Sequence, residues 1–190
     1  MRKSECAAPT LNGLNQAQAI LTDLTDLTDL MILDIHPPIV KTFDWPDEAA
    51  TAAFAEQLAQ HTRLTDAFIA LRGDLGAGKT TFVRYLLAAL GVQGRIKSPT
   101  YAVVEPYTLA PSGAAVWHFD FYRFNDPREW EEAGFRDIFA SPGLKLVEWP
   151  DNAGEHLPQP DWVMTIESLT DSARRVRVEA ITATGQALLA

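Results

Sequence analysis

The sequence predicts one α/β domain in which a mostly parallel sheet lies between helices and is extended by a C-terminal antiparallel hairpin. From residue 39 to residue 90, short apolar runs alternate with stretches of helical periodicity, as they do in domains with a parallel sheet. The later part of the chain holds mostly strand-like runs, and the last two of them predict the hairpin. The chain has 190 residues, 47% of them hydrophobic and 22% charged, which is typical of one globular domain.

The first 38 residues differ from the rest of the chain. Residues 21–30 repeat the tripeptide Leu-Thr-Asp three times, and a period of three matches neither a helix nor a strand. We expect residues 1–38 to form a low-complexity, disordered extension and residues 39–190 to form the folded domain, with Pro37 and Pro38 at the boundary. Met31 is a plausible internal start of translation.

The first half of the predicted domain alternates strands and helices. Residues 39–43 predict a short strand, and Asp47 can cap a helix that runs to about residue 60. The continuous apolar run at residues 68–71 is typical of a buried parallel strand. Residues 81–90 then place their apolar side chains on one helical face, and Gly91 supplies a helix stop.

The second half of the domain is predicted to be rich in strands. One helix signal interrupts them, because Asp126 can cap a helix, Pro127 occupies its first position and three glutamates follow in the first turns. The predicted strands are residues 101–107, 115–124, 144–149, 162–166 and 175–181.

Charge and cysteine content exclude several classes of protein. Sixteen basic residues against 25 acidic ones give a net charge of −9, which argues against autonomous binding of tRNA or DNA. Cys6 is the single cysteine, so neither an internal disulfide nor a cysteine zinc site is expected. No apolar run approaches the length of a membrane span, and the first residues lack the apolar core of a secretory signal. We therefore expect a cytoplasmic protein that does not enter a membrane.

A phosphate-binding loop is predicted at residues 73–80, whose sequence GDLGAGKT matches the pattern G-x-x-x-x-G-K-[ST] between a predicted strand and a predicted helix. The glycines let backbone N–H groups surround phosphates, Lys79 can reach the β- and γ-phosphates, and Thr80 can bind Mg²⁺. The sequence thus predicts a P-loop NTPase fold. No Asn-Lys-x-Asp motif for guanine occurs, which favours ATP. The predicted nucleotide-binding residues of the loop are Gly73, Gly76, Ala77, Gly78, Lys79, Thr80 and Thr81.

Two carboxylates are candidates for the chemistry that a phosphate loop alone cannot perform. Glu148 ends the short apolar strand 145–148, as a second metal ligand (Walker B residue) would; the alternative is a glutamate that faces solvent. Asp120 lies in the run WHFDFYR, where alternation puts it on one face with His118 and Tyr122. Asp120 could hold Mg²⁺ through water or orient the attacking water. His118 could orient a neighbour by a hydrogen bond; the alternatives are direct participation in the chemistry and plain packing.

A switch loop is predicted around Pro99, because Ser98 and Thr100 lie between two strands, where a loop would border the nucleotide. A threonine in such a loop can reach the γ-phosphate or its Mg²⁺ and so respond to the state of the nucleotide. The alternative is an ordinary turn that contains a proline.

Taken together, these motifs resemble those of one family, the bacterial tRNA threonylcarbamoyladenosine biosynthesis ATPases, known as TsaE or YjeE. The resemblance covers roughly residues 46–181, and the stretch before residue 39 departs from the family. Its motifs are GDLGAGKTT at residues 73–81, SPTY at 98–101, VEPY at 104–107, HFDFYR at 118–123, EAG at 132–134 and VEWP at 147–150.

The resemblance implies a cytoplasmic ATPase that supports transfer of a threonylcarbamoyl group to the adenosine 3′ to the anticodon of ANN-decoding tRNAs. It implies that partner proteins, TsaD with TsaB, perform the transfer. It also implies that Thr80 and Glu148 bind Mg²⁺, that Lys79 and Asp120 serve hydrolysis, and that Glu48 lies near the adenine. Trp149 would be a functional or interface aromatic residue.

Two other functions remain open at this point. A small-molecule kinase would use the same loop together with an arginine-bearing lid, for which Arg128 and Arg136 are the available candidates. A nucleotide-gated interaction module would bind ATP without significant turnover. A screen for phosphoryl acceptors would detect the first function, and turnover measured with and without partners would detect the second.

Overall fold

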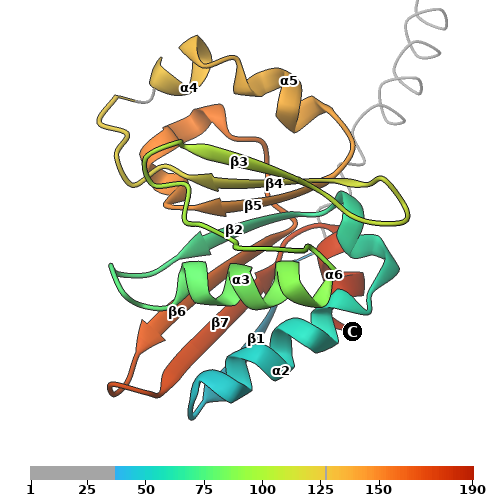
Figure 1. Cartoon of the computed structure of the whole chain (residues 1–190). Coiled ribbons are helices and arrows are strands. Elements are labelled where there is room, and N and C mark those ends of the chain that lie inside the picture. The colour runs from blue at the N-terminus through green and yellow to red at the C-terminus, as the bar shows by residue number, and fades with distance from the viewer. Residues whose placement is uncertain (1–36, 127) are drawn as a thin grey trace, which may run out of the picture. The chain divides into compact units, whose positions relative to one another are not determined.

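The structure of the protein is a computed structural model that describes residues 37–126 and 128–190. A seven-stranded sheet in the order β1-β7-β6-β2-β5-β4-β3 forms its centre (Figure 1). The expectation of a disordered extension concerns residues 1–38, which lie outside the described residues apart from the last two. The strands are β1 (Ile39–Trp45), β2 (Phe68–Arg72), β3 (Val104–Thr108), β4 (Ala115–Asp120), β5 (Leu144–Glu148), β6 (Trp162–Ser168) and β7 (Arg174–Ala180).

The sheet is mixed, with parallel pairing in the middle and antiparallel pairing at both edges. β6, β2, β5 and β4 are parallel to one another, and β3 joins β4 antiparallel. At the other edge, β7 pairs antiparallel with β6, and β1 pairs antiparallel with β7 over its full length, from Ile39 opposite Ala180 to Trp45 opposite Arg174. The predicted α/β fold with a C-terminal antiparallel hairpin is confirmed, and the first strand of the described domain is found to extend that hairpin.

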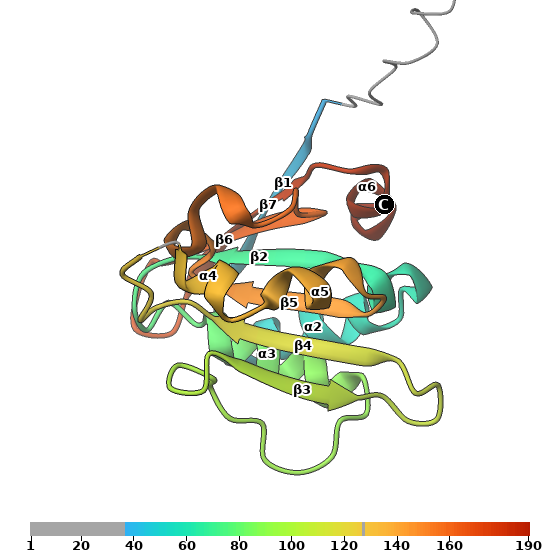
Figure 2. The same ribbon diagram turned by 90° about the horizontal axis from the view of Figure 1, so that it is seen from above.

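Helices cover both faces of the sheet, as Figure 2 shows with α4 and α5 over one face and α2 and α3 behind the other. Alternate residues of β2 belong to the two hydrophobic cores on opposite faces of the sheet. Ile69 and Leu71 belong to the core under α2 and α3, whereas Phe68 and Ala70 belong to the core under α4 and α5. The helices are α2 (Glu48–Ala59), α3 (Lys79–Ala89), α4 (Arg128–Glu132), α5 (Phe135–Ala140) and α6 (Ala183–Leu189), with short 3₁₀ helices η1 (Thr62–Asp66) and η2 (Pro150–His156).

Two of the predicted helix starts, those at Asp47 and Asp126, are confirmed by their capping bonds. Asp47 Oδ1 accepts a hydrogen bond of 2.9 Å from Ala50 N, which caps α2. Before α4, Asp126 Oδ1 accepts from Arg128 N at 3.0 Å, and Glu129 Oε1 accepts from Asp126 N at 3.1 Å. These two bonds cap the helix, and α4 begins where the sequence predicted a helix. Pro127, predicted at the first helical position, lies outside the described residues.

Two predicted strands are shorter than expected. The strand predicted from residue 101 begins at Val104, because Val103 has a positive φ of 68° that strand geometry does not allow. The strand predicted to end at residue 124 ends at Asp120. There the Asp120 side chain accepts a hydrogen bond from Tyr122 N at 3.0 Å, which turns the chain out of the sheet.

Candidate functional site

A cleft of about 240 Å³ opens at the carboxyl ends of β2, β4 and β5 and brings together most of the residues that the sequence singled out. Ligands of open α/β sheets bind at this edge, because the loops that follow parallel strands meet there. The cleft is lined by Leu75, Gly76, Gly78, Lys79, Thr80, Thr81, Ser98, Thr100, Asp120, Tyr122, Glu148 and Trp149. Gly73 and Ala77 belong to the same loop but do not line the cleft.

The loop at residues 73–80 connects β2 to α3 and depends on glycine at two positions. Gly73 has a φ of +137°, and a Cβ there would lie 2.3 Å from Ile166 O on the adjacent strand β6. Gly78 has a φ of +111° immediately before α3, and its carbonyl accepts the first helical hydrogen bond from Phe82 N at 2.9 Å. The helix thus begins at Lys79, so its N-terminal N–H groups lie at the cleft.

Lys79 is the cation of the cleft and is 4% exposed. Its Nζ donates to Gly73 O at 2.7 Å and to Asp74 O at 2.9 Å, and it lies 4.1 Å from the centre of the Trp149 ring. Burial lowers the pKa of the Lys79 ammonium, whereas the carboxylates of Glu148, Asp120 and Asp74 act in the opposite direction. The Lys79 ammonium supplies positive charge in the cleft, with which a bound anion could interact.

Glu148 is 2% exposed, so it does not face solvent as the alternative interpretation required. The Thr80 hydroxyl donates to its two carboxylate oxygens at 2.8 and 2.9 Å. His118 is fully buried, and its Nε2 lies 2.9 Å from Glu148 Oε1. No partner for His118 Nδ1 is found among the described residues, which favours the tautomer that carries its hydrogen on Nε2. The geometry therefore matches the orienting role predicted for His118.

Asp120 is 3% exposed and lies directly opposite Glu148 in the pairing of β4 with β5. Its Oδ2 accepts hydrogen bonds from the hydroxyls of Thr100 and Ser98, the second at 3.3 Å. The two hydroxyls lie 2.8 Å apart. The loop that was predicted to be a switch therefore contacts the Asp120 carboxylate directly.

A second cavity of about 270 Å³ adjoins the phosphate loop and contains Glu48, the residue expected near the adenine. It shares Gly76, Gly78 and Thr81 with the first cleft. The Tyr85 hydroxyl donates to Glu48 Oε1 at 2.7 Å and so holds the carboxylate. The other lining residues are Trp45, Thr51, Ala77, Asp171, Ser172 and Arg174, and the last three come from the β6–β7 hairpin, which sequence reasoning did not connect with the site.

The donor set of the cleft fits Mg²⁺ in the presence of a nucleotide. Thr80 and Glu148 offer hydroxyl and carboxylate oxygens, the ligands that Mg²⁺ prefers. The part of the chain that the structure describes holds no group of three or more His, Cys, Asp and Glu side chains arranged to bind a metal. In phosphate-loop proteins, phosphate oxygens and water complete the coordination of Mg²⁺.

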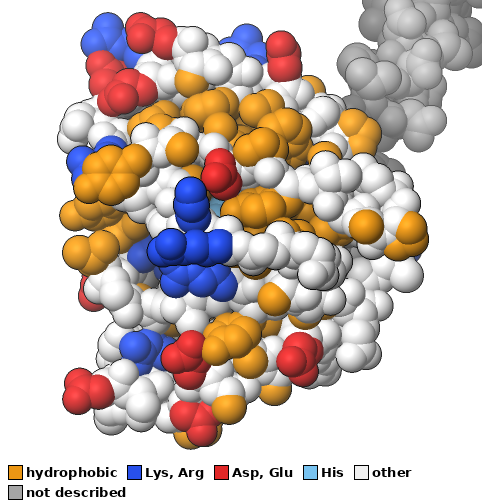
Figure 3. Space-filling view, in the orientation of Figure 1, with side chains coloured by type: hydrophobic (Ala, Val, Ile, Leu, Met, Phe, Trp, Pro, Cys, Tyr) orange, Lys and Arg blue, Asp and Glu red, His pale blue; other side chains and the backbone are white. Residues whose placement is uncertain are grey.

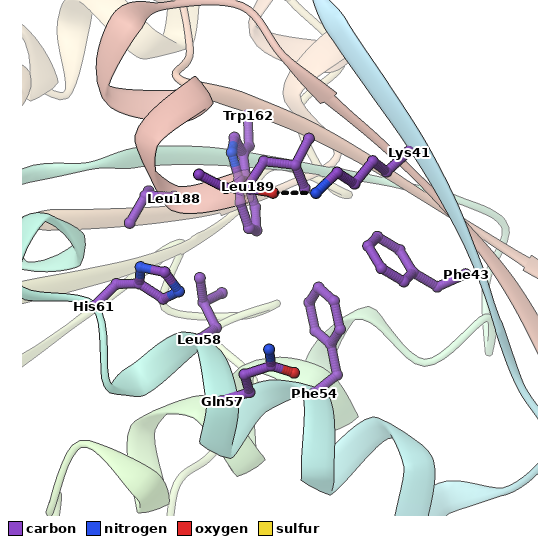
Figure 4. Close-up of a pocket in the computed structure, with 10 residues that line it drawn as sticks. Lys41, Phe43, Phe54, Gln57, Leu58, His61, Trp162, Leu188 and Leu189 are labelled. Carbon is purple, nitrogen blue, oxygen red and sulfur yellow. Dashed lines mark hydrogen bonds between the residues drawn. The ribbon is translucent and has the colours of Figure 1, made fainter.

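Another cavity, of about 120 Å³, is lined by residues of β1, α2, β6 and α6 and contains none of the predicted site residues (Figure 4). Phe43, Phe54 and Leu58 point into it, and the Lys41 ammonium at its edge donates a hydrogen bond to Leu189 O. Among residues 37–126 and 128–190, no helix is both long and apolar enough to cross a membrane.

The negative charge of the protein is unevenly distributed on the face that carries α3. Basic side chains gather in the middle of this face, whereas most acidic side chains in view lie toward its upper and lower edges (Figure 3). The exposed basic residues of α3 and of the segment that follows it are Arg84, Arg95 and Lys97. Arg84 Nε donates to Ile96 O at 3.2 Å, which ties this segment to α3.

Comparison with known proteins agrees with this geometry. The family model of the threonylcarbamoyl adenosine biosynthesis protein TsaE matches residues 45–176. The tRNA threonylcarbamoyladenosine biosynthesis protein TsaE of Haemophilus influenzae is 39% identical over 149 residues, which cover 76% of this chain and 92% of that protein. The TsaE protein of Bacillus subtilis is 34% identical over 136 residues, covering 72% of this chain and 82% of the relative.

Among solved structures, the crystal structure of YdiB from Bacillus subtilis superimposes with a TM-score of 0.66 at 26% identity and covers 81% of this chain and 94% of that one. The matched family region spans the phosphate loop, the segment of Ser98 and Thr100, and both buried carboxylates. The predicted family resemblance is confirmed, and the chain belongs to the TsaE family.

Proposed function

We propose that the protein is the ATP-binding and ATP-hydrolysing subunit required to form N6-threonylcarbamoyladenosine on the adenosine 3′ to the anticodon of ANN-decoding tRNAs. The observation that carries the proposal is the convergence of Lys79, Thr80, Asp120 and Glu148 in one cleft beside a phosphate loop. Membership of the TsaE family supports the tRNA-modification role, because the curated relatives are named for threonylcarbamoyladenosine biosynthesis.

The phosphate loop binds the triphosphate in this proposal. Backbone N–H groups of residues 73–81 surround the phosphates, and the Lys79 ammonium, near Gly73 O and Asp74 O, reaches the β- and γ-phosphates. Glu48 borders the adjoining cavity, and its carboxylate can accept a hydrogen bond from the exocyclic amine of adenine. The two connected cavities thus provide one compartment for phosphates and one for a base.

The metal ligands are Thr80 and Glu148. Bound Mg²⁺ neutralises charge on the phosphates and thereby lowers the barrier to their transfer. His118 keeps the Glu148 carboxylate oriented by its hydrogen bond of 2.9 Å, as residues behind metal ligands commonly do. Glu148 and His118 are almost completely buried, so they hold this orientation without competition from solvent.

Asp120 assists hydrolysis by orienting the attacking water. The water oxygen bonds to the γ-phosphorus, the bond from that phosphorus to the β,γ-bridging oxygen breaks, and the proton of the water passes to a phosphate oxygen or to Asp120. Ser98 and Thr100 act as the switch, because both hydroxyls contact the Asp120 carboxylate and border the same cleft. Cleavage of the γ-phosphate would then change the contacts of the loop that carries Ser98 and Thr100.

The threonylcarbamoyl transfer itself belongs to partner proteins in this proposal, namely TsaD with TsaB. The net charge of −9 supports this division, because a subunit with this balance is poorly suited to hold tRNA alone. The proposed location is the cytoplasm.

Neither alternative function gains support from the geometry. Arg128 is 78% exposed in its side chain and pairs with Asp126 at 2.6 Å, and Arg136 is 75% exposed and lies 3.5 Å from Glu131. Neither arginine lines the cleft, as the lid of a kinase would require. A module that binds ATP without turnover would not need an oriented Asp120 carboxylate beside the cleft.

The decisive experiment measures phosphate release and threonylcarbamoyladenosine formation by the full chain with Mg·ATP and a threonylcarbamoyl donor, with and without the TsaB–TsaD pair and an ANN-decoding tRNA. We expect the modified nucleoside only in the complete mixture, and we expect Lys79→Ala to abolish both signals. Nucleoside formation that is independent of this protein would contradict the proposal. Binding of ATP without any phosphate release in the complete mixture would favour the interaction module instead.

A further inference from the structure

Arg174, the first residue of β7, connects the β6–β7 hairpin to the phosphate loop. Its Nε donates to Ala77 O at 2.8 Å. Its Nη1 donates to three carbonyl oxygens of the hairpin turn, those of Thr170 at 2.9 Å, Ala173 at 3.0 Å and Asp171 at 3.3 Å. The planar guanidinium thereby holds two segments that are far apart in the sequence in a fixed relative position.

The bond to Ala77 O determines the direction of a donor in the phosphate loop. The Ala77 carbonyl and the Gly78 N–H belong to one planar trans peptide group, so they point in opposite directions. A carbonyl that is held toward Arg174 therefore leaves the Gly78 N–H on the other side of the loop. No hydrogen bond from that N–H occurs within the described residues, and Gly78 lines the cleft.

The orientation of the Ala77–Gly78 peptide needs a restraint from outside the loop, because Gly78 flanks it. Gly78 has a φ of +111°, and glycine can change its backbone angles at little steric cost. A Cβ at Gly78 would lie 3.9 Å from Arg174 Nε, so the guanidinium packs directly beside the loop. Arg174 makes no ion pair with a carboxylate in the part of the chain described here, so its charge also adds to the positive potential of the loop.

We propose that Arg174 is a positioning residue for phosphate binding: it holds the Ala77–Gly78 peptide in the orientation that presents the Gly78 N–H to a phosphate. The hairpin turn at residues 169–173 is thereby coupled to nucleotide affinity. This inference rests on the proposed function, because it concerns the same nucleotide site. It differs from a role in reading the base, which the position of Arg174 beside Glu48 and Thr51 would also allow.

The experiment separates phosphate positioning from base contact by using a probe without a base. Binding of Mg·ATP and of inorganic tripolyphosphate is measured by calorimetry for the wild type, Arg174→Gln and Arg174→Lys. The matched control is Arg175→Gln, because Arg175 is the next residue and forms an exposed pair with Asp44 at 2.8 Å instead of contacting the loop. Melting temperatures are measured for all four proteins.

We expect Arg174→Gln to weaken both probes by the same factor, on the order of tenfold, because one donor bond to the loop and one charge are lost. Arg174→Lys should recover part of the affinity for both probes, because an ammonium can still donate to Ala77 O. Arg175→Gln should bind both probes as the wild type does, and Arg174→Lys should melt close to the wild-type temperature.

Three results would overturn the inference while leaving the proposed function standing. They are unchanged binding of both probes, weakened binding of ATP alone, and a loss with Arg174→Gln that Arg174→Lys does not relieve and that parallels a lower melting temperature. A wild-type protein that binds neither probe would overturn the proposed function and this inference with it.

Discussion

The cleft beside the phosphate loop and the cavity of Figure 4 differ in the kind of side chains that they bury. The cleft beside the phosphate loop contains a buried lysine, whose ammonium donates to the loop backbone, and two buried carboxylates, which accept hydrogen bonds from the hydroxyls of Thr80 and Thr100. The cavity of Figure 4 is formed mainly by aromatic and aliphatic side chains from α2, α6 and the sheet, with Lys41 at its edge bonded to Leu189 O. Both are built on the same sheet.

The difference indicates which residues serve a ligand and which serve the fold. Burial of charged groups costs free energy, and the interactions of these groups inside the protein offset that cost only in part. Burial of apolar side chains stabilises the folded state directly, by about 25 cal/mol for each Å² removed from water. Substitutions in the cleft should therefore affect turnover more than stability, and substitutions around the apolar cavity should do the opposite.

The largest effect on the cleft side is expected from Lys79→Ala. It removes the cation aimed at the β- and γ-phosphates, so ATP hydrolysis should fall to background, a loss on the order of 10³-fold or more. A phosphate-release assay measures this. Lys41→Ala is the matched control from the apolar cavity and should retain wild-type turnover. Near-normal hydrolysis by Lys79→Ala would exclude the loop as the catalytic site.

The next largest effect is expected from substitutions that remove the charge of the two buried carboxylates but keep their volume. Asp120→Asn and Glu148→Gln keep the side-chain size but remove the anion, so each should lose Mg²⁺-dependent turnover, by on the order of 10²-fold. Their melting temperatures should stay at or above that of the wild type, because a buried charge is removed. An active variant that melts at a clearly lower temperature would identify its carboxylate as structural.

The opposite pattern is expected from Leu58→Ala in the apolar cavity. Leu58 is 3% exposed, and its truncation should lower the free energy of unfolding by about 2–5 kcal/mol. Urea denaturation measures this change, and titration with Mg·ATP below the transition should give wild-type affinity. A weakened affinity for Mg·ATP with unchanged stability would show that the cleft and the apolar cavity are not independent.

A smaller effect is expected from Tyr85→Phe, which changes the base compartment of the nucleotide site and leaves the phosphate loop intact. The substitution removes the hydroxyl that donates to Glu48 Oε1 at 2.7 Å and so releases the carboxylate. Affinity for Mg·ATP should fall a few-fold, whereas affinity for inorganic tripolyphosphate should stay constant, because only the base compartment changes. Equal losses for the two ligands would mean that Glu48 acts on the phosphates instead.

The smallest effect is expected from removal of residues 1–30. Their Leu-Thr-Asp repeat offers no apolar face, and its leucines could not offset an ordering cost of roughly 1–2 kcal/mol per residue. A chain that starts at Met31 should keep its stability, ATP turnover and binding to the partner pair. Limited proteolysis of the full chain should trim it to near Pro37 and Pro38. Resistance of residues 1–30 to protease, or loss of the partner complex on truncation, would contradict this expectation.

The elements that sequence reasoning predicted correctly are those with a local signal. Asp47, the glycines of the phosphate loop and the apolar run ending at Glu148 each indicate their structure within a few residues. The predicted grouping of His118 with Asp120 also follows from a local pattern, and both side chains are buried at the site.

The features that were missed have different causes, and one of them depends on a contact between distant parts of the chain. Nothing near Arg174 in the sequence indicates that it contacts Ala77, because their hydrogen bond exists only after the hairpin packs against the loop. α6 carried a usable signal, since Thr182 Oγ1 accepts a hydrogen bond from Gly185 N at 3.1 Å as a helix cap. The early end of β4 depends on the Asp120 side chain, which competes with the sheet for a backbone N–H.

The pairing of β1 with β7 has a consequence for the order of folding during synthesis. β1 ends at Trp45, whereas its partner strand is complete only at Ala180. At a translation rate of about 5–20 residues per second, β1 leaves the ribosome roughly 7–27 s before its partner. Until then, the backbone N–H and C=O groups of β1 lack the partner strand with which they pair in the folded domain. We therefore expect the nascent chain to depend on chaperones in this interval, and we expect the domain to complete its fold only after its last strand has been made.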